Sequence, residues 1–254
     1  MKFEMKQEKM RDMLEKITMQ NLFPISIIKA DESGLSSIQR EANGVVIREA
    51  IFKKSFFESF EVEETEYIEL DVQRALSVIK KVDSTKKLSF ETKENKVVIK
   101  GDKVSINLSL REPNKDDILE RMPFEIKEGK PCIKNIKLSS TIKMKLSDLK
   151  DTTDYGSSLS TEFYTFKADK DGFEIRVGDL HKFSDFVIFK PEVEFSVEDE
   201  SEAVYTVGLP QLANTFTEKK FTINYASDAP AYMIEENEHC LLGILFPPQV
   251  KPKE

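Results

Sequence analysis

Segments of the first half of this chain recur in the second half in the same order, and this internal repeat limits the folds that the chain can adopt. Lys29–Leu35 (KADESGL) recurs as Lys167–Phe173 (KADKDGF). Three further pairs follow at nearly the same offset: the strand-like Val45–Phe52 with Phe183–Lys190, the acidic Glu58–Glu69 with Glu192–Glu202, and the amphipathic Asp71–Val82 with Leu209–Lys220. Four elements in one order predict two domains of similar architecture.

The best-matched pair of segments has the composition of a tight turn. Asp31-Glu32-Ser33-Gly34 and Asp169-Lys170-Asp171-Gly172 each lie between apolar runs. Aspartate and glycine favour such turns, since glycine tolerates a positive φ without steric cost. Each half is therefore predicted to contain a β-hairpin at this point.

Each half is also predicted to open with a strand and a helix. Lys2–Lys6 alternates as a strand, and Gln7–Gln20 follows with apolar residues at helical spacing. In the second half we predict a strand at Asn135–Ser139 and a helix at Thr141–Asp154, with Ile142, Leu146 and Leu149 on one face. After the second helix of each half come β-type runs, at Lys87–Phe90, Val97–Ile99 and Val104–Leu110, then at Phe221–Tyr225, Ala231–Ile234 and Leu241–Leu245. Each half thus has two helices and eight or nine strands.

A segment rich in proline separates the halves. Glu112–Pro131 contains three prolines and a glycine among mixed charges, with one apolar island at Met122-Pro123-Phe124. Residues of these types make regular structure unfavourable. We predict an N-terminal domain at residues 1–111, a connector at 112–132 and a C-terminal domain at 133–254.

Composition indicates a soluble, intracellular, globular protein. Hydrophobic residues make up 39% and charged residues 33% of 254 residues, which allows sizeable cores under a charged surface. No apolar run approaches the ~20 residues that span a bilayer, and the N-terminus has no signal-peptide core. The two cysteines provide no disulfide or metal framework. The net charge of −8 argues against a protein that grips DNA over most of its surface, so any DNA role must be local or topological.

The sequence contains no catalytic motif that we recognise. Nine glycines form neither a Walker nor a dinucleotide-binding pattern, and the two histidines, His181 and His239, lie in unrelated segments. Asp116-Asp117 has no partner motif for a metal. We therefore predict no enzyme, no cofactor and no metal site.

The four predicted helices differ in charge. In Asp71–Val82, apolar residues gather on one side, and the opposite side carries Arg74, Lys80 and Lys81 without any acid. Gln7–Gln20 places Glu8, Asp12 and Glu15 near the middle of its exposed face, and Thr141–Asp154 mixes lysines with aspartates. A lysine-bearing helix face is usually solvated, so this pattern alone does not establish a binding site.

Taken in order, these elements resemble the two-domain subunit of the sliding clamp of the proliferating-cell-nuclear-antigen (PCNA) type. The likeness runs along nearly the whole chain and is carried by the Met-Lys-Phe-Glu start, Lys170–Phe173, Leu209–Phe216 and Asp228-Ala229-Pro230. The ending Ile244–Pro248 is similar to the family's Leu-Ala-Pro ending. It departs by having phenylalanine for alanine and a second proline for the usual basic residue.

The resemblance implies an α+β clamp fold and a ring of three subunits, with antiparallel sheets outside and two helices per domain lining the hole around duplex DNA. A closed ring needs only weak phosphate contacts, because topology prevents escape, so the acidic net charge is compatible with this role. The acidic middle of Gln7–Gln20 departs from the positive lining expected. The residues predicted to face DNA are Arg74, Lys80, Lys81, Lys9, Lys16, Lys143, Lys150, Lys219 and Lys220.

The resemblance also implies two kinds of protein contact. Subunits would join edge to edge through Lys103–Leu110 and His181–Phe189, where a proline at Ile106 or Val187 would be disruptive. DNA polymerase, a clamp loader and other replication and repair proteins would insert a short apolar and aromatic motif beneath the connector. That groove is predicted to comprise Val45, Ile47, Met122, Pro123, Phe124, Pro230, Leu245, Phe246 and Pro247.

Alternatives remain open from the sequence. The ring is predicted to be a homotrimer, acting as a processivity factor inside an archaeal cell or a eukaryotic nucleus. The mixed charges on the helices favour, as a second reading, one subunit of a heterotrimeric clamp. A protein-binding scaffold without a DNA role is the third.

Overall fold

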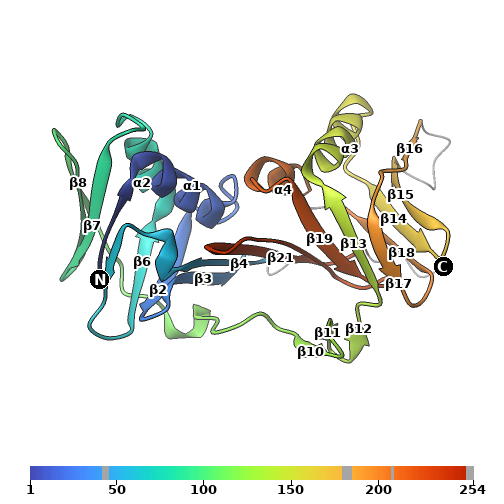
Figure 1. Ribbon diagram of the computed structural model, residues 1–254, viewed down its shortest axis with the longest axis horizontal. Helices are drawn as coiled ribbons and strands as arrows, with labels where there is room; N and C mark the ends of the chain where they lie inside the picture. Colours follow the sequence, from blue (N-terminus) through green and yellow to red (C-terminus); the bar gives the residue numbers. More distant parts are fainter. Residues whose placement is uncertain (42–45, 179–184, 207–208, 250–254) are drawn as a thin grey trace. The chain divides into compact units, whose positions relative to one another are not determined.

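The computed structural model describes residues 1–41, 46–178, 185–206 and 209–249. The chain forms two compact units, built mainly from residues 1–122 and 123–254. Each unit also includes a short segment from the other half of the chain, such as Glu236–Leu242 in the first unit. Figure 1 shows the elements of both units coloured along the sequence.

Before the connector, the described residues of the first unit form nine strands and two α-helices. These elements are β1 (Lys2–Lys6), α1 (Gln7–Thr18), β2 (Ile25–Asp31), β3 (Gly34–Arg40), β4 (Ile47–Lys53), the 3-10 helix η1 (Lys54–Phe56), β5 (Ser59–Glu61), β6 (Glu66–Asp71), α2 (Val72–Ile79), β7 (Lys87–Lys93), β8 (Lys96–Lys100) and β9 (Ser105–Ser109).

The connector and the second half follow with the remaining elements. They are η2 (Lys115–Asp117), β10 (Glu125–Lys127), β11 (Lys130–Ile133), β12 (Ile136–Lys137), β13 (Ser140–Lys145), α3 (Leu146–Ser158), β14 (Tyr164–Asp169), β15 (Gly172–Val177), β16 (Val187–Phe189), β17 (Glu194–Val197), β18 (Ser201–Tyr205), α4 (Leu209–Thr215), β19 (Lys220–Tyr225), β20 (Ala231–Glu236) and β21 (Cys240–Phe246).

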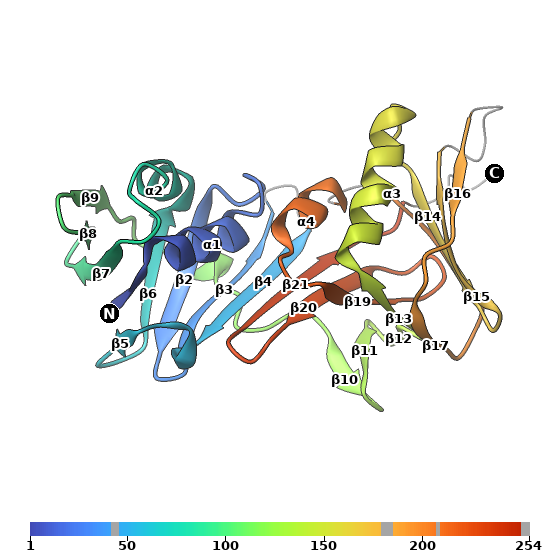
Figure 2. The same cartoon turned by 45° about the horizontal axis from the view of Figure 1, so that its top comes forward.

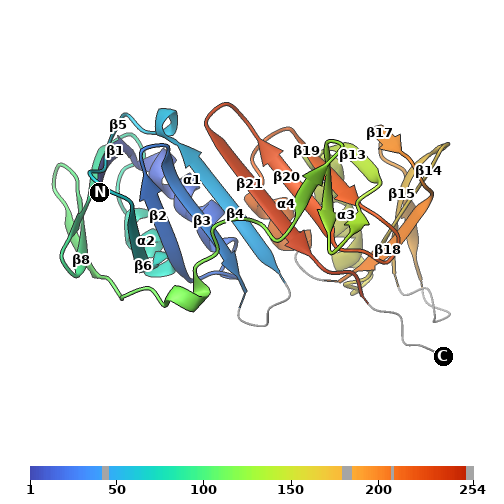
Figure 3. The same ribbon diagram turned by 90° about the horizontal axis from the view of Figure 1, so that it is seen from below.

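Strand order confirms the repeat. In the first half the strands lie in the orders β5-β1-β7-β8-β9 and β6-β2-β3-β4, and in the second half in the orders β17-β13-β19-β20-β21 and β18-β14-β15-β16. Each strand of the second half therefore has the place of the strand numbered twelve lower. The registered pairs are antiparallel, as predicted for this α+β fold. Figure 3 shows β6, β2, β3 and β4 as neighbouring strands.

Both predicted hairpins are present, with a two-residue loop in each. Asp31 pairs with Gly34, and Asp169 pairs with Gly172. The first aspartate of each loop accepts a hydrogen bond from the backbone, from Ser33 N at 2.9 Å and from Asp171 N at 2.8 Å. Gly34 has a φ of 138°, as predicted, whereas the φ of Gly172 lies outside the positive region.

The prediction of a strand at Asn135–Ser139 and a helix at Thr141–Asp154 is wrong, because a further strand precedes the helix. Residues 140–145 form strand β13, and helix α3 begins only at Leu146. Ile142 and Met144 are buried while Thr141 and Lys143 are not, which is the alternation of a half-buried strand. The spacing of Ile142, Leu146 and Leu149 matched a helix by coincidence, because Ile142 belongs to the strand.

The connector is more regular than predicted. Its last part enters a three-stranded meander, β10-β11-β12, which extends past the predicted boundary at residue 132. Both of its turns have two residues with positive φ, Glu128 (52°) and Gly129 (78°), then Lys134 (49°) and Asn135 (71°). Such turns match the twist of paired strands, which explains how a proline-containing segment still forms a ladder.

Each unit has its own core, with a pair of helices lying together against its strands (Figure 2). In the first unit, Met10, Met13, Leu14 and Ile17 of α1 are buried. The ring of Phe3 stacks on that of Phe90, with 4.6 Å between centroids. In the second unit, Phe166 packs on Tyr205 and Tyr225. Burial of such side chains contributes about 1.5–3 kcal/mol each, so these apolar residues stabilise the core of each unit.

Candidate functional site

Helix α2 presents the acid-free basic surface that the sequence predicted. Its N-terminus is capped by Asp71, whose carboxylate accepts a hydrogen bond from Arg74 N at 2.8 Å. Arg74, Lys80 and Lys81 are exposed. Within the described ranges, neither Arg74 nor Lys81 forms an ion pair with an acid. These two cations are therefore available to an external anion.

The acidic residues of α1 are largely neutralised by neighbouring cations. Glu15 accepts Lys80 Nζ at 2.9 Å, and its carboxylate is 4.0 Å from Arg11 Nε. Lys16 Nζ lies 3.3 Å from Asp12. The acidic centre of this helix is thus less repulsive to an anion than its sequence alone indicates.

Two residues of α1 that were predicted to face DNA, Lys16 and Lys9, have ammonium groups that contact other parts of the protein. Lys16 is only 1% exposed, which contradicts the prediction that its ammonium faces a ligand. Its position at the end of the apolar stripe explains the burial. Lys9 is exposed, and its ammonium lies over the Phe56 ring, 5.5 Å from the centroid.

The predicted basic residues of the second half are mostly paired. Lys143 belongs to strand β13 and not to a helix, and its Nζ lies 3.9 Å from Glu194. Lys220 begins β19 and pairs with the same carboxylate at 2.6 Å. Lys150 on α3 and Lys219 after α4 are exposed, and the described part of the chain supplies no acid that pairs with them.

The two pairs of helices therefore differ in charge. Helix α3 exposes Asp151 and Asp154 beside Lys150, and α4 has no charged residue. In the first unit, exposed cations on and after α2 outnumber the unpaired acids of α1. A polyanion would be attracted to the helices of the first unit more than to those of the second.

The predicted assembly strands lie at the ends of their sheets. β9 is the last strand in the order β5-β1-β7-β8-β9, and β16 is the last beyond β15. His181–Ser184, which the sequence prediction included, lies outside the described residues. Phe186 (54% exposed) and Ile188 (43%) are among the most exposed large apolar side chains of the described chain. Such a patch on an edge strand marks a surface suited to a protein contact.

The direction of each edge amide follows from the ladder. Leu110 N donates to Asn95 O and Gly101 N donates to Val104 O, so the amides of Ile106 and Leu108 point to β8. The amides of Ser105, Asn107 and Ser109 therefore point to the free edge. By the same parity, Val187 and Phe189 bond to β15, and the Ile188 amide points outward. The positions chosen from sequence, Ile106 and Val187, are thus internal to their own sheets.

Residues predicted for the peptide groove differ widely in exposure. Phe246 is 1% exposed, and its ring packs edge-on against Tyr205 at 5.1 Å, so the expectation that it lies at a surface is wrong. Ile47, Met122 and Leu245 are also buried. Pro123 is exposed, Phe124, Pro230 and Pro247 are half-buried, and Val45 lies outside the described residues.

Phe124 is the aromatic residue of this set that reaches the surface. Its ring meets Tyr232 at 4.7 Å in a T-shaped contact. Tyr232 in turn lies so close to Gly243 that an added Cβ there would be 2.4 Å from its hydroxyl oxygen. The side chain of Tyr232 therefore packs between the backbone of β21 and the ring of Phe124.

Before Phe124, the connector is tied to the first unit through Glu120. Tyr67 donates to Glu120 Oε1 at 2.5 Å, and Lys29 Nζ lies 3.4 Å from Oε2. The hydrogen bond from Tyr67 is the main cause that lowers the pKa of Glu120. The carboxylate is thus charged at neutral pH.

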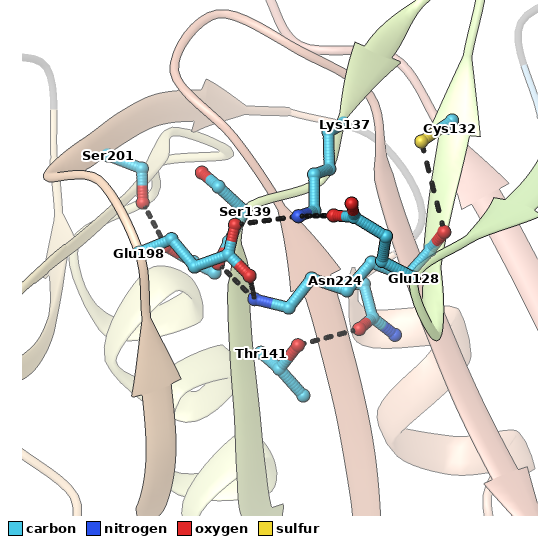
Figure 4. A network of polar contacts seen from close by, with 10 residues as sticks. Glu128, Cys132, Lys137, Ser139, Thr141, Glu198, Ser201 and Asn224 are labelled. Atoms are coloured by element: carbon cyan, nitrogen blue, oxygen red, sulfur yellow. Dashed lines mark hydrogen bonds and ion pairs between the residues drawn. The ribbon is translucent and has the colours of Figure 1, made fainter.

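After Phe124, the meander is tied to the second unit by an ionic network (Figure 4). Lys137 Nζ lies 2.8 Å from Glu128 and 3.0 Å from Glu198. Lys130 Nζ lies 3.1 Å from Glu198 and donates to Ser139 O at 2.6 Å. The connector is consequently held on both sides of Met122-Pro123-Phe124.

Sequence reasoning missed Ile126, which is 61% exposed and the most exposed large apolar residue of the described chain. It lies two residues after Phe124, on β10. An isoleucine between Glu125 and Lys127 in a connector gives no periodic signal, so only the structure identifies it. No described group of histidine, cysteine or acidic residues is placed to hold a metal, and no described helix is both long and apolar enough to span a membrane.

Comparison with known proteins identifies the fold. No family model matches the sequence, and no curated protein matches it. The structure is similar to that of A. fulgidus PCNA, solved with the C-terminal region of FEN-1 bound, with a TM-score of 0.81, 17% identity and coverage of 99% of both chains. PCNA of Entamoeba histolytica gives 0.78, 12% identity and 98% of both chains. PCNA of Thermococcus kodakaraensis gives 0.78, 15% identity, 98% of this chain and 99% of that one. The chain therefore has the PCNA-type clamp fold.

Proposed function

We propose that this chain, which has the fold of PCNA over its whole length, is a subunit of a ring-shaped clamp that encircles duplex DNA. The ring would tether DNA polymerase and other replication and repair proteins and catalyse nothing itself. The observation that carries this proposal is the structural match to three solved PCNA chains, each over 98–99% of both chains. We also propose that the N-terminal domain comprises residues 1–111, the connector residues 112–132 and the C-terminal domain residues 133–254.

Three features support the individual contacts. Arg74 on α2, together with Lys80 and Lys81 directly after that helix, would contact phosphates. The outward amides of β9 and β16 would pair between neighbouring subunits. The short motif of a client protein would bind at Phe124, Pro123, Pro230 and Pro247. The protein would act together with the DNA, in an archaeal cell or a eukaryotic nucleus.

A heterotrimeric ring is the second candidate, and the unequal helices favour it. Asp151 and Asp154 of α3 are exposed, so three identical chains would place six such acids on the lining. Two different partner subunits would supply the missing positive charge. The mass of the pure protein, alone and then with other clamp-like chains of the same cell, separates the two candidates.

Encirclement predicts retention that depends on the ends of the DNA. The protein is incubated with a linear duplex biotinylated at both ends, which a ring can thread, and streptavidin is then added to block the ends. We expect the protein to remain on the blocked duplex through a wash at about 1 M salt, which screens phosphate contacts to within about 3 Å. A restriction cut in the middle should release it. Loss of the protein in the high-salt wash before cutting would contradict encirclement.

Charge removal on α2 predicts weaker contact with DNA. Arg74→Ala, Lys80→Ala and Lys81→Ala together should lower the salt dependence of DNA binding, because each lost phosphate contact removes about 0.9 from the slope of log K against log salt. Lys80→Ala also leaves Glu15 with only the more distant Arg11 as a cationic partner, which adds repulsion. The control is an equal charge change at Lys54, Lys96 and Lys170, which are exposed elsewhere. Fluorescence anisotropy checks the slope, and equal slopes for both triple variants would exclude α2 as the DNA surface.

A further inference from the structure

The ionic network at the meander converges on one carboxylate. Glu198, just after β17, lies 3.1 Å from Lys130 on β11 and 3.0 Å from Lys137 on β12. These lysines come from two different strands of the meander. A carboxylate that accepts two cations from neighbouring strands restricts their position more than a single ion pair does.

The backbone reinforces this attachment. Glu198 N donates to Ser139 O at 3.3 Å, and Lys130 Nζ donates to the same carbonyl at 2.6 Å. The hydrogen bond from Lys137 is the main cause that lowers the pKa of Glu198, and the bond to Glu128 is the main cause that raises the pKa of Lys137. Glu198 and Lys137 are therefore both charged at neutral pH.

The register of the meander separates its two faces. Lys127 pairs with Lys130, and Cys132 pairs with Lys137, so these residues share one face. Ile126 pairs with Pro131, and Ile133 pairs with Ile136, on the other face. Ile126 and Ile136 are 61% and 47% exposed. Glu198 thus contacts the charged face, whereas on the opposite face Ile126 and Ile136 are exposed and Ile133 is buried.

The segment that precedes the meander has little structure of its own. Residues 118–124 form no helix or strand, and Phe124 immediately precedes β10. The position of Phe124 therefore depends on the contact of its ring with Tyr232 and on the segments that flank it, with Glu120 on one side and the meander on the other. A shift of the meander would move Phe124 and Ile126 together.

We propose that Glu198 is a positioning residue for the client groove, because its bonds to Lys130 and Lys137 set where Phe124 and Ile126 lie. This proposal rests on the proposed function, in that it requires a client peptide to bind at Phe124. Glu198 itself does not touch the peptide. Its effect is to reduce the conformations of the connector that must be ordered on binding, which is the usual benefit of a pre-organised site.

The test compares Glu198→Gln with Glu200→Gln. Glu200 is in the same loop and lies 3.8 Å from Lys167 on β14, so it provides a matched loss of charge away from the connector. The probe is an uncharged peptide with a glutamine, an aliphatic residue and two adjacent aromatics, titrated by calorimetry. We expect Glu198→Gln to weaken binding about five-fold, in line with two partly exposed ion pairs, and Glu200→Gln to leave it unchanged.

Two readouts separate positioning from a general structural effect. Amide hydrogen exchange at Ile126–Lys130 should become faster in Glu198→Gln, while the melting temperature and the oligomeric mass stay those of the wild type. Wild-type affinity should fall towards the value of the variant at about 0.5 M salt, where the Debye length is about 4 Å, whereas the variant should respond little.

The outcomes distinguish this proposal from the proposed function. If the wild type binds no such peptide, the client groove is wrong and the role of Glu198 is lost with it. If the wild type binds and Glu198→Gln binds equally well, with unchanged exchange at the meander, the role of Glu198 is wrong and the groove stands. Equal weakening by Glu200→Gln would also overturn the proposal, since a change anywhere in the loop would then have the same effect.

Discussion

Proline at Asn107 or at Ile188 is expected to convert the assembled protein into monomers. Both amides point away from their own sheets, so proline at either position removes a donor only from the free edge. The fold of the chain itself should survive. Size-exclusion chromatography with light scattering should show a wild-type mass of three 29.2 kDa chains and a single-chain mass for each variant.

The matched controls retain the amide and change only the side chain. Asn107→Ala and Ile188→Val should remain assembled, because the edge ladder is intact. Proline at Ile106 or Val187 is less informative, because it breaks the bonds to β8 or β15 and disturbs the unit itself. Trimers in both outward proline variants would exclude these edges as the interface. A monomeric wild type that assembles only with other clamp-like chains would support the heterotrimer.

Truncation of Phe246 is expected to destabilise the fold, whereas truncation of Phe124 is expected to weaken only peptide binding. Phe246 is fully buried against Tyr205, and a buried Phe→Ala change costs about 3–5 kcal/mol. This is a large part of the 5–15 kcal/mol that stabilises an ordinary domain. Phe124 is half-buried, and its loss should weaken the peptide by about ten-fold, or about 1.4 kcal/mol.

Two measurements check this pair. Denaturant unfolding gives the stability of each variant, and calorimetry with the peptide gives the affinity of those that remain folded. Phe195→Ala, which removes a 43% exposed ring, serves as a control and should leave both values unchanged. Wild-type stability of Phe246→Ala would show that its ring is not part of the core. Unchanged affinity of Phe124→Ala would remove it from the groove.

The repeat was readable from the sequence because it rests on local signals. Turn residues at Asp31–Gly34 and the apolar face of α2 are properties of short segments, and each occurs at the same relative place in the other half. Four signals in one order predicted two similar halves, and the strand orders confirm them. The boundary between strand β13 and helix α3 could not be predicted from the sequence, since Ile142 fits both a strand face and a helix face. Only the pairing of β13 with β19 removes the ambiguity.

The candidate sites were predicted less completely, because exposure is a property of the folded chain. Lys16 has the sequence context of a solvated cation, yet it is buried beside Asp12. Phe246 was placed at a surface by analogy with a small residue of the family, and packing against Tyr205 puts it in a core. Glu198 gave no sequence signal at all, since its two lysines lie more than sixty residues away.

By itself, the sequence determined the repeated architecture, the α+β class and the acid-free face of α2, because all three depend on periodicity and turn chemistry within short segments. The tertiary structure alone decided which charges are paired, which aromatic rings are buried and which amides point to a free edge. These depend on register and on contacts between distant segments: a one-residue change in register would exchange the outward and inward amides of β9 without changing a residue.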